Sequence, residues 1–121
     1  MTQILAVAAG GAVGSVLRYL ISRISFVSTF PWATVLVNIL GSFLLGLFLT
    51  VAGSRIEISQ EARAFVAIGL LGGFTTFSTF SHHTLSLWQA ERFAFAGLNV
   101  LLNVVLGLFA AWLGWRLGRV I

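Results

Sequence analysis

Hydrophobic residues fill most of this chain in four long runs, which short polar segments separate. The runs cover roughly Ile4 to Ile24, Trp32 to Gly53, Ala64 to Trp88, and Phe93 to Trp115. At about 1.5 Å per helical residue, each is long enough to cross about 30 Å of hydrocarbon. The pattern therefore predicts an all-α membrane protein with four transmembrane helices, forming a single domain over residues 1–121.

The composition supports the same class. Hydrophobic side chains make up 59% of the 121 residues and charged ones only 8%, with a mean hydropathy of +1.04, which is unlike ordinary soluble domains. The chain begins Met-Thr-Gln without a basic region, and its first hydrophobic run is too long for a signal-peptide core, so we expect this run to be retained. Without cysteine, disulfides and thiolate metal sites are excluded.

The charge balance is basic, with seven arginines against three glutamates and a pI of about 11.6. In a soluble protein this balance would suggest nucleic acid. Here the arginines lie toward the ends of the hydrophobic runs, where their long side chains can reach lipid headgroups. We therefore expect membrane lipid as a partner, and no nucleic acid.

The distribution of arginine bears on orientation. Four spans place the N-terminus, the 54–63 loop and the C-terminal tail on one side, and the 25–31 and 89–92 connections on the other. Four arginines fall on the first side (Arg55, Arg63, Arg116, Arg119) and three on the second (Arg18, Arg23, Arg92). So small a bias hardly specifies an orientation. We expect dual topology and an antiparallel homodimer; a single orientation fixed by context is the open alternative.

Pairs of small residues four positions apart suggest close helix packing. Four such pairs lie in the hydrophobic runs: Gly10 with Gly14, Ser42 with Gly46, Gly69 with Gly73, and Gly114 with Gly118. They let helix backbones approach where lipid offers no hydrophobic driving force. Because four helices enclose no spacious cavity, we expect the pairs to support association between chains.

The third run contains the sequence Gly-Gly-Phe-Thr-Thr-Phe-Ser-Thr-Phe-Ser at residues 72–81. Glycine weakens a helix and hydroxyls compete for its backbone groups, so the segment predicts a break between Gly72 and Thr76. Carbonyls freed at membrane depth need a partner, and a hard cation such as sodium is suitable. A continuous helix whose glycines only permit close contact remains the alternative.

Polar residues within the runs are mostly neutral. The three glutamates lie outside the runs, so the carboxylates that proton carriers and cation paths use are missing. The neutral donors are Asn38, Asn99, Asn103, Thr75, Thr76, Ser78, Thr79 and Ser81, and Thr34, Asn38 and Ser42 share one helical stripe. Amide and hydroxyl donors can replace part of an anion's hydration shell without trapping the ion.

Other residues leave two interpretations open. Phe77 and Phe80 lie on one helical face, where ring edges can attract a small anion or simply pack. Arg18 either raises the anion concentration in a vestibule or anchors the first helix. His82 and His83 point in different directions, which disfavours a metal site, and we expect both to line a vestibule or an interface.

Three segments together carry a family resemblance. Gly11-Ala12-Val13-Gly14 with Leu17-Arg18-Tyr19, Thr34 with Val37-Asn38, and residues 72–81 resemble the Fluc (CrcB) family of bacterial fluoride channels, over essentially the whole chain. The resemblance implies a dual-topology homodimer in the bacterial inner membrane. Such a dimer exports fluoride passively through two antiparallel pores at its interface and holds a central structural sodium ion.

The resemblance also assigns residues by position. The main-chain carbonyls of Gly72 and Thr75 of both subunits would bind sodium. The fluoride pore would be formed by Asn38, Phe77, Phe80, Ser78, Thr79, Ser81, Asn103, Thr34 and Arg18. The chain departs from the family at His83, where relatives often carry a carboxylate, and the match is looser around Asn99 and Asn103.

Three other function classes compete with this interpretation. A small multidrug exporter has four helices and dual topology, but it needs a carboxylate in the first span, and residues 4–24 contain none. A structural subunit of a larger complex would give the unusual third run no purpose. An enzyme is not expected, because no nucleophile, base and orienting group can be assembled from this inventory.

Overall fold

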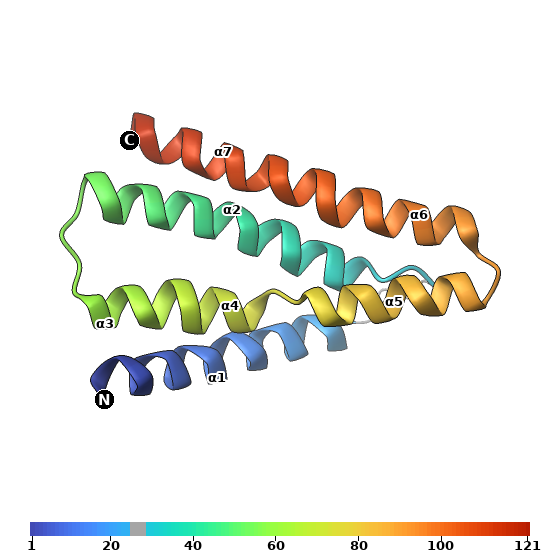
Figure 1. Cartoon of the computed structure of the whole chain (residues 1–121), viewed down its shortest axis with the longest axis horizontal. Coiled ribbons are helices and arrows are strands. Elements are labelled where there is room, and N and C mark those ends of the chain that lie inside the picture. The colour runs from blue at the N-terminus through green and yellow to red at the C-terminus, as the bar shows by residue number, and fades with distance from the viewer. Residues whose placement is uncertain (25–28) are drawn as a thin grey trace.

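The protein folds into antiparallel helices that lie along one long axis (Figure 1). The computed structural model describes residues 1–24 and 29–121. The helices are α1 (Thr2–Arg23), α2 (Trp32–Ser54), α3 (Gln60–Arg63), the π-helix η1 (Ala64–Leu70), α4 (Leu71–Phe74), α5 (Phe77–Gln89), α6 (Phe93–Leu101), the π-helix η2 (Leu102–Leu106) and α7 (Gly107–Val120).

Four stretches in the described part of the chain are long and apolar enough to cross a membrane. They are Thr2–Arg23, Trp32–Ser54, Gln60–Gln89 and Phe93–Val120. The four predicted spans are therefore confirmed, and the last two extend beyond the predicted bounds. Both termini and the α2–α3 connection lie at one end of the bundle, as expected, and the α5–α6 turn lies at the other (Figure 1). Residues 25–28 of the predicted 25–31 connection lie outside the described residues.

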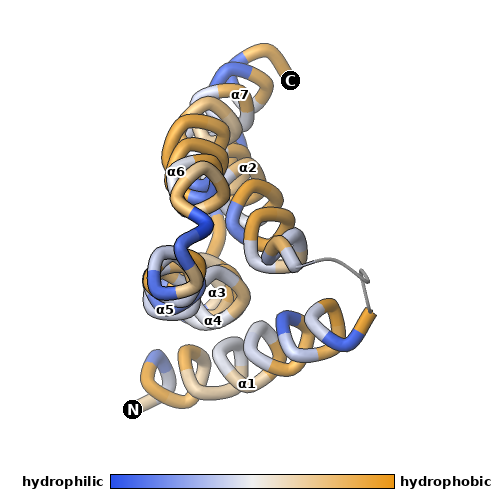
Figure 2. The backbone as a smooth tube through the Cα atoms, turned by 90° about the vertical axis from the view of Figure 1, so that its right-hand side faces the viewer, coloured by the Kyte–Doolittle hydropathy of each residue, from blue (hydrophilic) through white to orange (hydrophobic). Residues whose placement is uncertain are grey.

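The third span lies in the middle of the bundle. Seen along the bundle, α3 to α5 lie between α1 on one side and α2 with α6 and α7 on the other (Figure 2). The most extensive helix contacts join α1 to η1 and α4, and α2 to α7. The third span is therefore flanked on both sides, and side chains from α1 and α2 can both reach it.

The small-residue pairs form these contacts within the chain. A Cβ added at Gly14 would overlap the Leu70 carbonyl and lie 2.9 Å from the Phe74 nitrogen, and one at Gly114 would lie 2.8 Å from the Leu47 nitrogen. Our expectation that the pairs support association between chains is wrong for these glycines. Small residues permit close backbone approach between two helices of one subunit as well as between two subunits.

The third span is broken at two residues. Helix α4 ends at Phe74 and α5 begins at Phe77, and between them Thr75 (φ −84°, ψ 158°) and Thr76 (φ −152°, ψ 120°) are extended. The break lies inside the predicted interval from Gly72 to Thr76, and that prediction is confirmed.

The predicted cause of the break is partly wrong. Gly72 and Gly73 are both helical within α4, and a Cβ at Gly73 would lie 2.8 Å from the Gly11 carbonyl oxygen of α1. Gly73 thus allows close contact, and the threonines cap the helix ends. Thr75 Oγ1 donates to the Leu71 carbonyl at 3.0 Å, and Thr76 Oγ1 accepts from the main-chain N–H of Thr79 at 3.1 Å.

Candidate functional site

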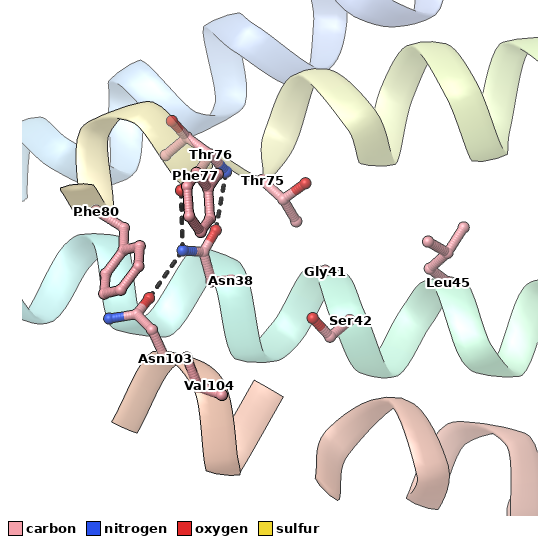
Figure 3. Close-up of a pocket in the computed structure, with 10 residues that line it drawn as sticks. All are labelled: Asn38, Gly41, Ser42, Leu45, Thr75, Thr76, Phe77, Phe80, Asn103 and Val104. Atoms are coloured by element: carbon pink, nitrogen blue, oxygen red, sulfur yellow. Dashed lines mark hydrogen bonds between the residues drawn. The ribbon is translucent and has the colours of Figure 1, made fainter. Parts of the chain in front are cut away.

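Asn38 of α2 pairs with the backbone exposed by the break. Its Oδ1 accepts from the Thr76 N–H at 2.8 Å, and its Nδ2 donates to the Thr76 carbonyl at 3.0 Å. The same Nδ2 donates to Asn103 Oδ1 at 2.8 Å (Figure 3). A side-chain amide has the donor and acceptor of a peptide group, so Asn38 Oδ1 replaces the carbonyl partner that the Thr76 N–H lost when the helix broke. The Thr76 carbonyl, at the N-cap position of α5, gains Asn38 Nδ2 as an additional donor.

Arg18 of α1 reaches the same break from the opposite side. Its Nε donates to the Gly73 carbonyl at 3.1 Å, and its side chain is half-buried. In a continuous helix this carbonyl would accept from the N–H of Phe77. The guanidinium is thus directed at the break, which argues against a purely anchoring role at the membrane surface.

Three carbonyls at the break are left over. The Leu71 carbonyl accepts from Thr75, while those of Gly73 and Thr76 are used by Arg18 and Asn38. Among the described residues, none donates a hydrogen bond to the carbonyls of Gly72, Phe74 or Thr75. Main-chain oxygens are suitable ligands for a hard cation, so the chemistry of the Gly72 and Thr75 carbonyls fits the predicted sodium site.

A cavity of about 250 Å³ opens beside the break and gathers five of the predicted site residues. We call it the break cavity; Figure 3 shows its lining residues: Asn38, Gly41, Ser42, Leu45, Thr75, Thr76, Phe77, Phe80, Asn103 and Val104. The Phe77 and Phe80 rings meet edge to face with centroids 5.4 Å apart. Phe80 is buried, whereas Phe77 is 77% exposed and so packs little within the subunit.

A second cavity, of about 500 Å³, lies toward α1. This arginine cavity brings together Arg18, Thr34, Thr79 and His83, and it shares Thr76 with the break cavity. His83 Nδ1 and Thr34 Oγ1 are hydrogen-bonded at 3.2 Å. Arg18, for which a vestibule role and an anchoring role were both open, therefore faces the same cavity as His83. His82 lines neither cavity, so the structure does not place both histidines at one cavity.

Three predicted residues lie outside both cavities. Gly72, Ser78 and Ser81 are exposed on the surface of α4 and α5. The Ser78 hydroxyl hydrogen-bonds with that of Thr76 at 3.3 Å, and Ser81 donates to the Phe77 carbonyl at 2.9 Å. These residues therefore do not join the rest of the predicted set within one subunit.

Several lining residues were not assigned to the predicted pore or sodium site, although Thr76 and Ser42 were among the polar candidates. Thr76 lines both cavities, and Gly41 is needed because a Cβ there would overlap Thr75 Cγ2 and lie 3.3 Å from the Phe74 ring. Ser42 belongs to the stripe with Thr34 and Asn38, so that stripe could have indicated it. Nothing in the local sequence could have indicated Gly41, since the residues that it contacts lie at the break in the third span.

Known proteins are similar to this chain over most of its length. Residues 5–115 match the family model described as CrcB-like protein, Camphor Resistance (CrcB). Proteins named "Fluoride-specific ion channel FluC" are similar along almost their whole length: the one from Shewanella frigidimarina (strain NCIMB 400) is 52% identical, that from Shewanella sp. (strain ANA-3) 49%, and that from Shewanella halifaxensis (strain HAW-EB4) 48%. Each alignment covers 97% of this chain and 96% of the relative.

These matches and the four helices able to cross a bilayer support a multi-pass membrane protein. The family model covers most of the residues, and the relatives reach about half identity over nearly full length. This chain therefore belongs to the CrcB-like family.

Proposed function

We propose that this chain is a fluoride-selective channel of the bacterial inner membrane, through which cytoplasmic fluoride leaves passively. The relatives that bear this activity in their names support it. The observation that carries the proposal is the break cavity. Neutral amides and hydroxyls, together with two phenyl rings, surround a short non-helical segment in the middle of a membrane span.

The lining chemistry suits a small, strongly hydrated anion. Hydroxyls and amides can compensate for lost water, and the positive edges of Phe77 and Phe80 add a weaker attraction. A guanidinium in the neighbouring arginine cavity raises the local anion concentration at the entrance. A larger halide should not fit the same donor spacing. The pore residues we propose are Arg18, Thr34, Asn38, Phe77, Ser78, Thr79, Phe80, Ser81 and Asn103.

A second copy of the chain would complete the pore. Phe77 is 77% exposed in the subunit, and Gly72, Ser78 and Ser81 are exposed beside it. Polar groups that face lipid at membrane depth are unfavourable, so we expect another protein surface to cover this face. The nearly balanced arginines are compatible with an antiparallel partner. We propose a dual-topology homodimer with two antiparallel pores along this face.

The same face carries the proposed sodium site. The carbonyls of Gly72 and Thr75 lack donors among the described residues, and an unsatisfied group in hydrocarbon costs several kcal/mol. In an antiparallel dimer, two carbonyls from each subunit would present oxygen ligands to one central cation. The ion would be structural, since it holds the two breaks together.

Efflux from liposomes tests the channel directly. Purified chain is reconstituted into vesicles loaded with fluoride or, in parallel, with chloride, and release is followed with ion-selective electrodes. Rapid fluoride release with negligible chloride release is expected. Absence of fluoride release from well-folded, dimeric protein would reject the proposal, and release of both halides would reject its selectivity.

A further inference from the structure

A network of side-chain hydrogen bonds connects α2 to α5 through the fourth span. Asn38 Nδ2 donates to Asn103 Oδ1 at 2.8 Å, and Asn103 Nδ2 donates to Asn99 Oδ1 at 3.0 Å. Asn99 Nδ2 donates to Thr84 Oγ1 at 2.9 Å, and that hydroxyl donates to the Phe80 carbonyl at 2.9 Å. We call Asn38, Asn103, Asn99 and Thr84 the amide network. It begins at the break and ends at the main-chain carbonyl of Phe80, a buried residue that lines the break cavity.

Main-chain groups fix the direction of the network. The Thr76 N–H can only donate, so Asn38 must turn Oδ1 toward it, which directs Nδ2 toward Asn103. Further along, Asn103 Nδ2 also donates to the Asn99 carbonyl at 2.9 Å, a group that can only accept. Asn103 therefore has its Oδ1 left for Asn38. Only one orientation of each amide satisfies all of these partners.

Asn99 is the most deeply buried member. Its side chain is 0% exposed, and Nδ2 also approaches the Phe80 carbonyl at 3.5 Å. Burying an amide is unfavourable unless its hydrogen bonds are made, and a leucine of similar size would fill the same space without that requirement. The amide of Asn99 is thus explained better by the partners it orients than by packing.

We propose that Asn99 is a positioning residue, which holds Asn103 and Phe80 in the geometry that the fluoride path requires. Asn99 lines neither described cavity, but it contacts these two residues, which line the break cavity. Without the amide of Asn99, Asn103 Nδ2 keeps only the main-chain oxygen of residue 99 as an acceptor, and Thr84 loses its donor. Selectivity for a small ion depends on fixed donor spacing, so a loosened cavity would admit larger anions. This inference rests on the proposed channel function.

A double-mutant cycle tests the positioning role. Fluoride and chloride efflux are measured for wild type, Asn99→Leu, Asn103→Leu and the double variant, each checked for dimer content and thermal stability. We expect Asn99→Leu to lower the fluoride-to-chloride ratio on the order of tenfold, and the double variant to be no worse than Asn103→Leu. Effects that multiply independently would overturn the inference.

Two further variants sharpen the cycle. Ser42→Ala changes a residue that lines the break cavity but lies outside the amide network, so its effect should multiply with that of Asn99→Leu. Thr84→Val removes one hydroxyl at nearly constant volume and serves if Asn99→Leu does not fold; it should also lower the ratio. A wild-type ratio in Thr84→Val would overturn the inference.

The wild-type measurement separates the two proposals. Wild-type vesicles that release no fluoride would reject the channel function and the positioning role with it. Selective wild-type efflux with independent effects of Asn99 and Asn103 would overturn the positioning role alone.

Discussion

Replacing Gly14 with alanine should disturb both packing and the break, because the contact involved lies between two helix backbones. A Cβ at this position would overlap the Leu70 carbonyl oxygen and lie 2.9 Å from both the Leu70 carbonyl carbon and the Phe74 nitrogen. Real Cβ atoms essentially never come within 3.0 Å of another heavy atom. The neighbours are backbone atoms of the third span, so no flexible side chain can move aside.

The magnitude follows from the two consequences of the clash. Helix α1 has to move away from the third span by on the order of 1 Å, and overpacking of this kind costs about 1–3 kcal/mol. The same movement lengthens the 3.1 Å hydrogen bond from Arg18 to the Gly73 carbonyl, and a charged hydrogen bond contributes about 1.5–3 kcal/mol. Alanine regains up to about 1 kcal/mol of helix propensity. A net destabilisation on the order of 3 kcal/mol is expected.

The assay compares thermal unfolding of purified variants in one detergent. Gly14→Ala should lower the unfolding midpoint by on the order of 10 °C and reduce fluoride efflux, since Arg18 is displaced. The matched control is Gly53→Ala in α2, where a Cβ meets nothing within 4 Å, and this change should leave the midpoint unchanged or raise it. Equal midpoints for the two variants would refute the proposed helix contact.

Four other outcomes are expected. Asn38→Asp places carboxylate oxygens opposite two acceptors, the Thr76 carbonyl and Asn103 Oδ1, and adds a negative charge to a path for an anion. Fluoride efflux should therefore fall at least about tenfold, and unchanged efflux would show that Asn38 is not part of the pore. The Phe77 side chain is 77% exposed in the subunit, so Phe77→Ile should impair efflux while gel filtration still shows a dimer. Normal efflux would indicate that the ring only packs. Glu91 has φ 57°, a conformation that glycine adopts freely, so Glu91→Gly should raise the unfolding midpoint by an amount equivalent to about 1 kcal/mol, and a lower midpoint would contradict this strain. Replacing sodium with N-methylglucamine during purification should lower dimer stability if the carbonyls at the break bind the ion; equal stability in both salts would count against that site.

Local sequence features predicted the spans and the break. Span length depends on the number of consecutive apolar residues, and that number is readable without any tertiary contact. The break was also local, because Thr75 and Thr76 supply hydroxyls that compete for their own backbone. The role given to Gly72 and Gly73 was less accurate, because a glycine in a membrane helix signals either flexibility or close contact. Only the neighbouring Gly11 of α1 decides between the two for Gly73.

The contacts around the candidate site depended on tertiary structure. Helical spacing placed Thr34, Asn38 and Ser42 on one stripe, but it could not show that Asn38 would pair with Thr76, 38 positions away. Arg18 in the same way lies 55 positions from Gly73, whose carbonyl it binds.

Four membrane spans and the neutral polar side chains within them can be read from residue order alone, which also favours a break in the third span. Which of these groups meet depends on the folded chain: Asn38 and Arg18 lie at the break, Asn99 lies behind Asn103, and the glycines pack within the subunit. Periodicity fixes positions around one helix axis, whereas the rotation and pairing of helices depend on the packing of residues far apart in the chain.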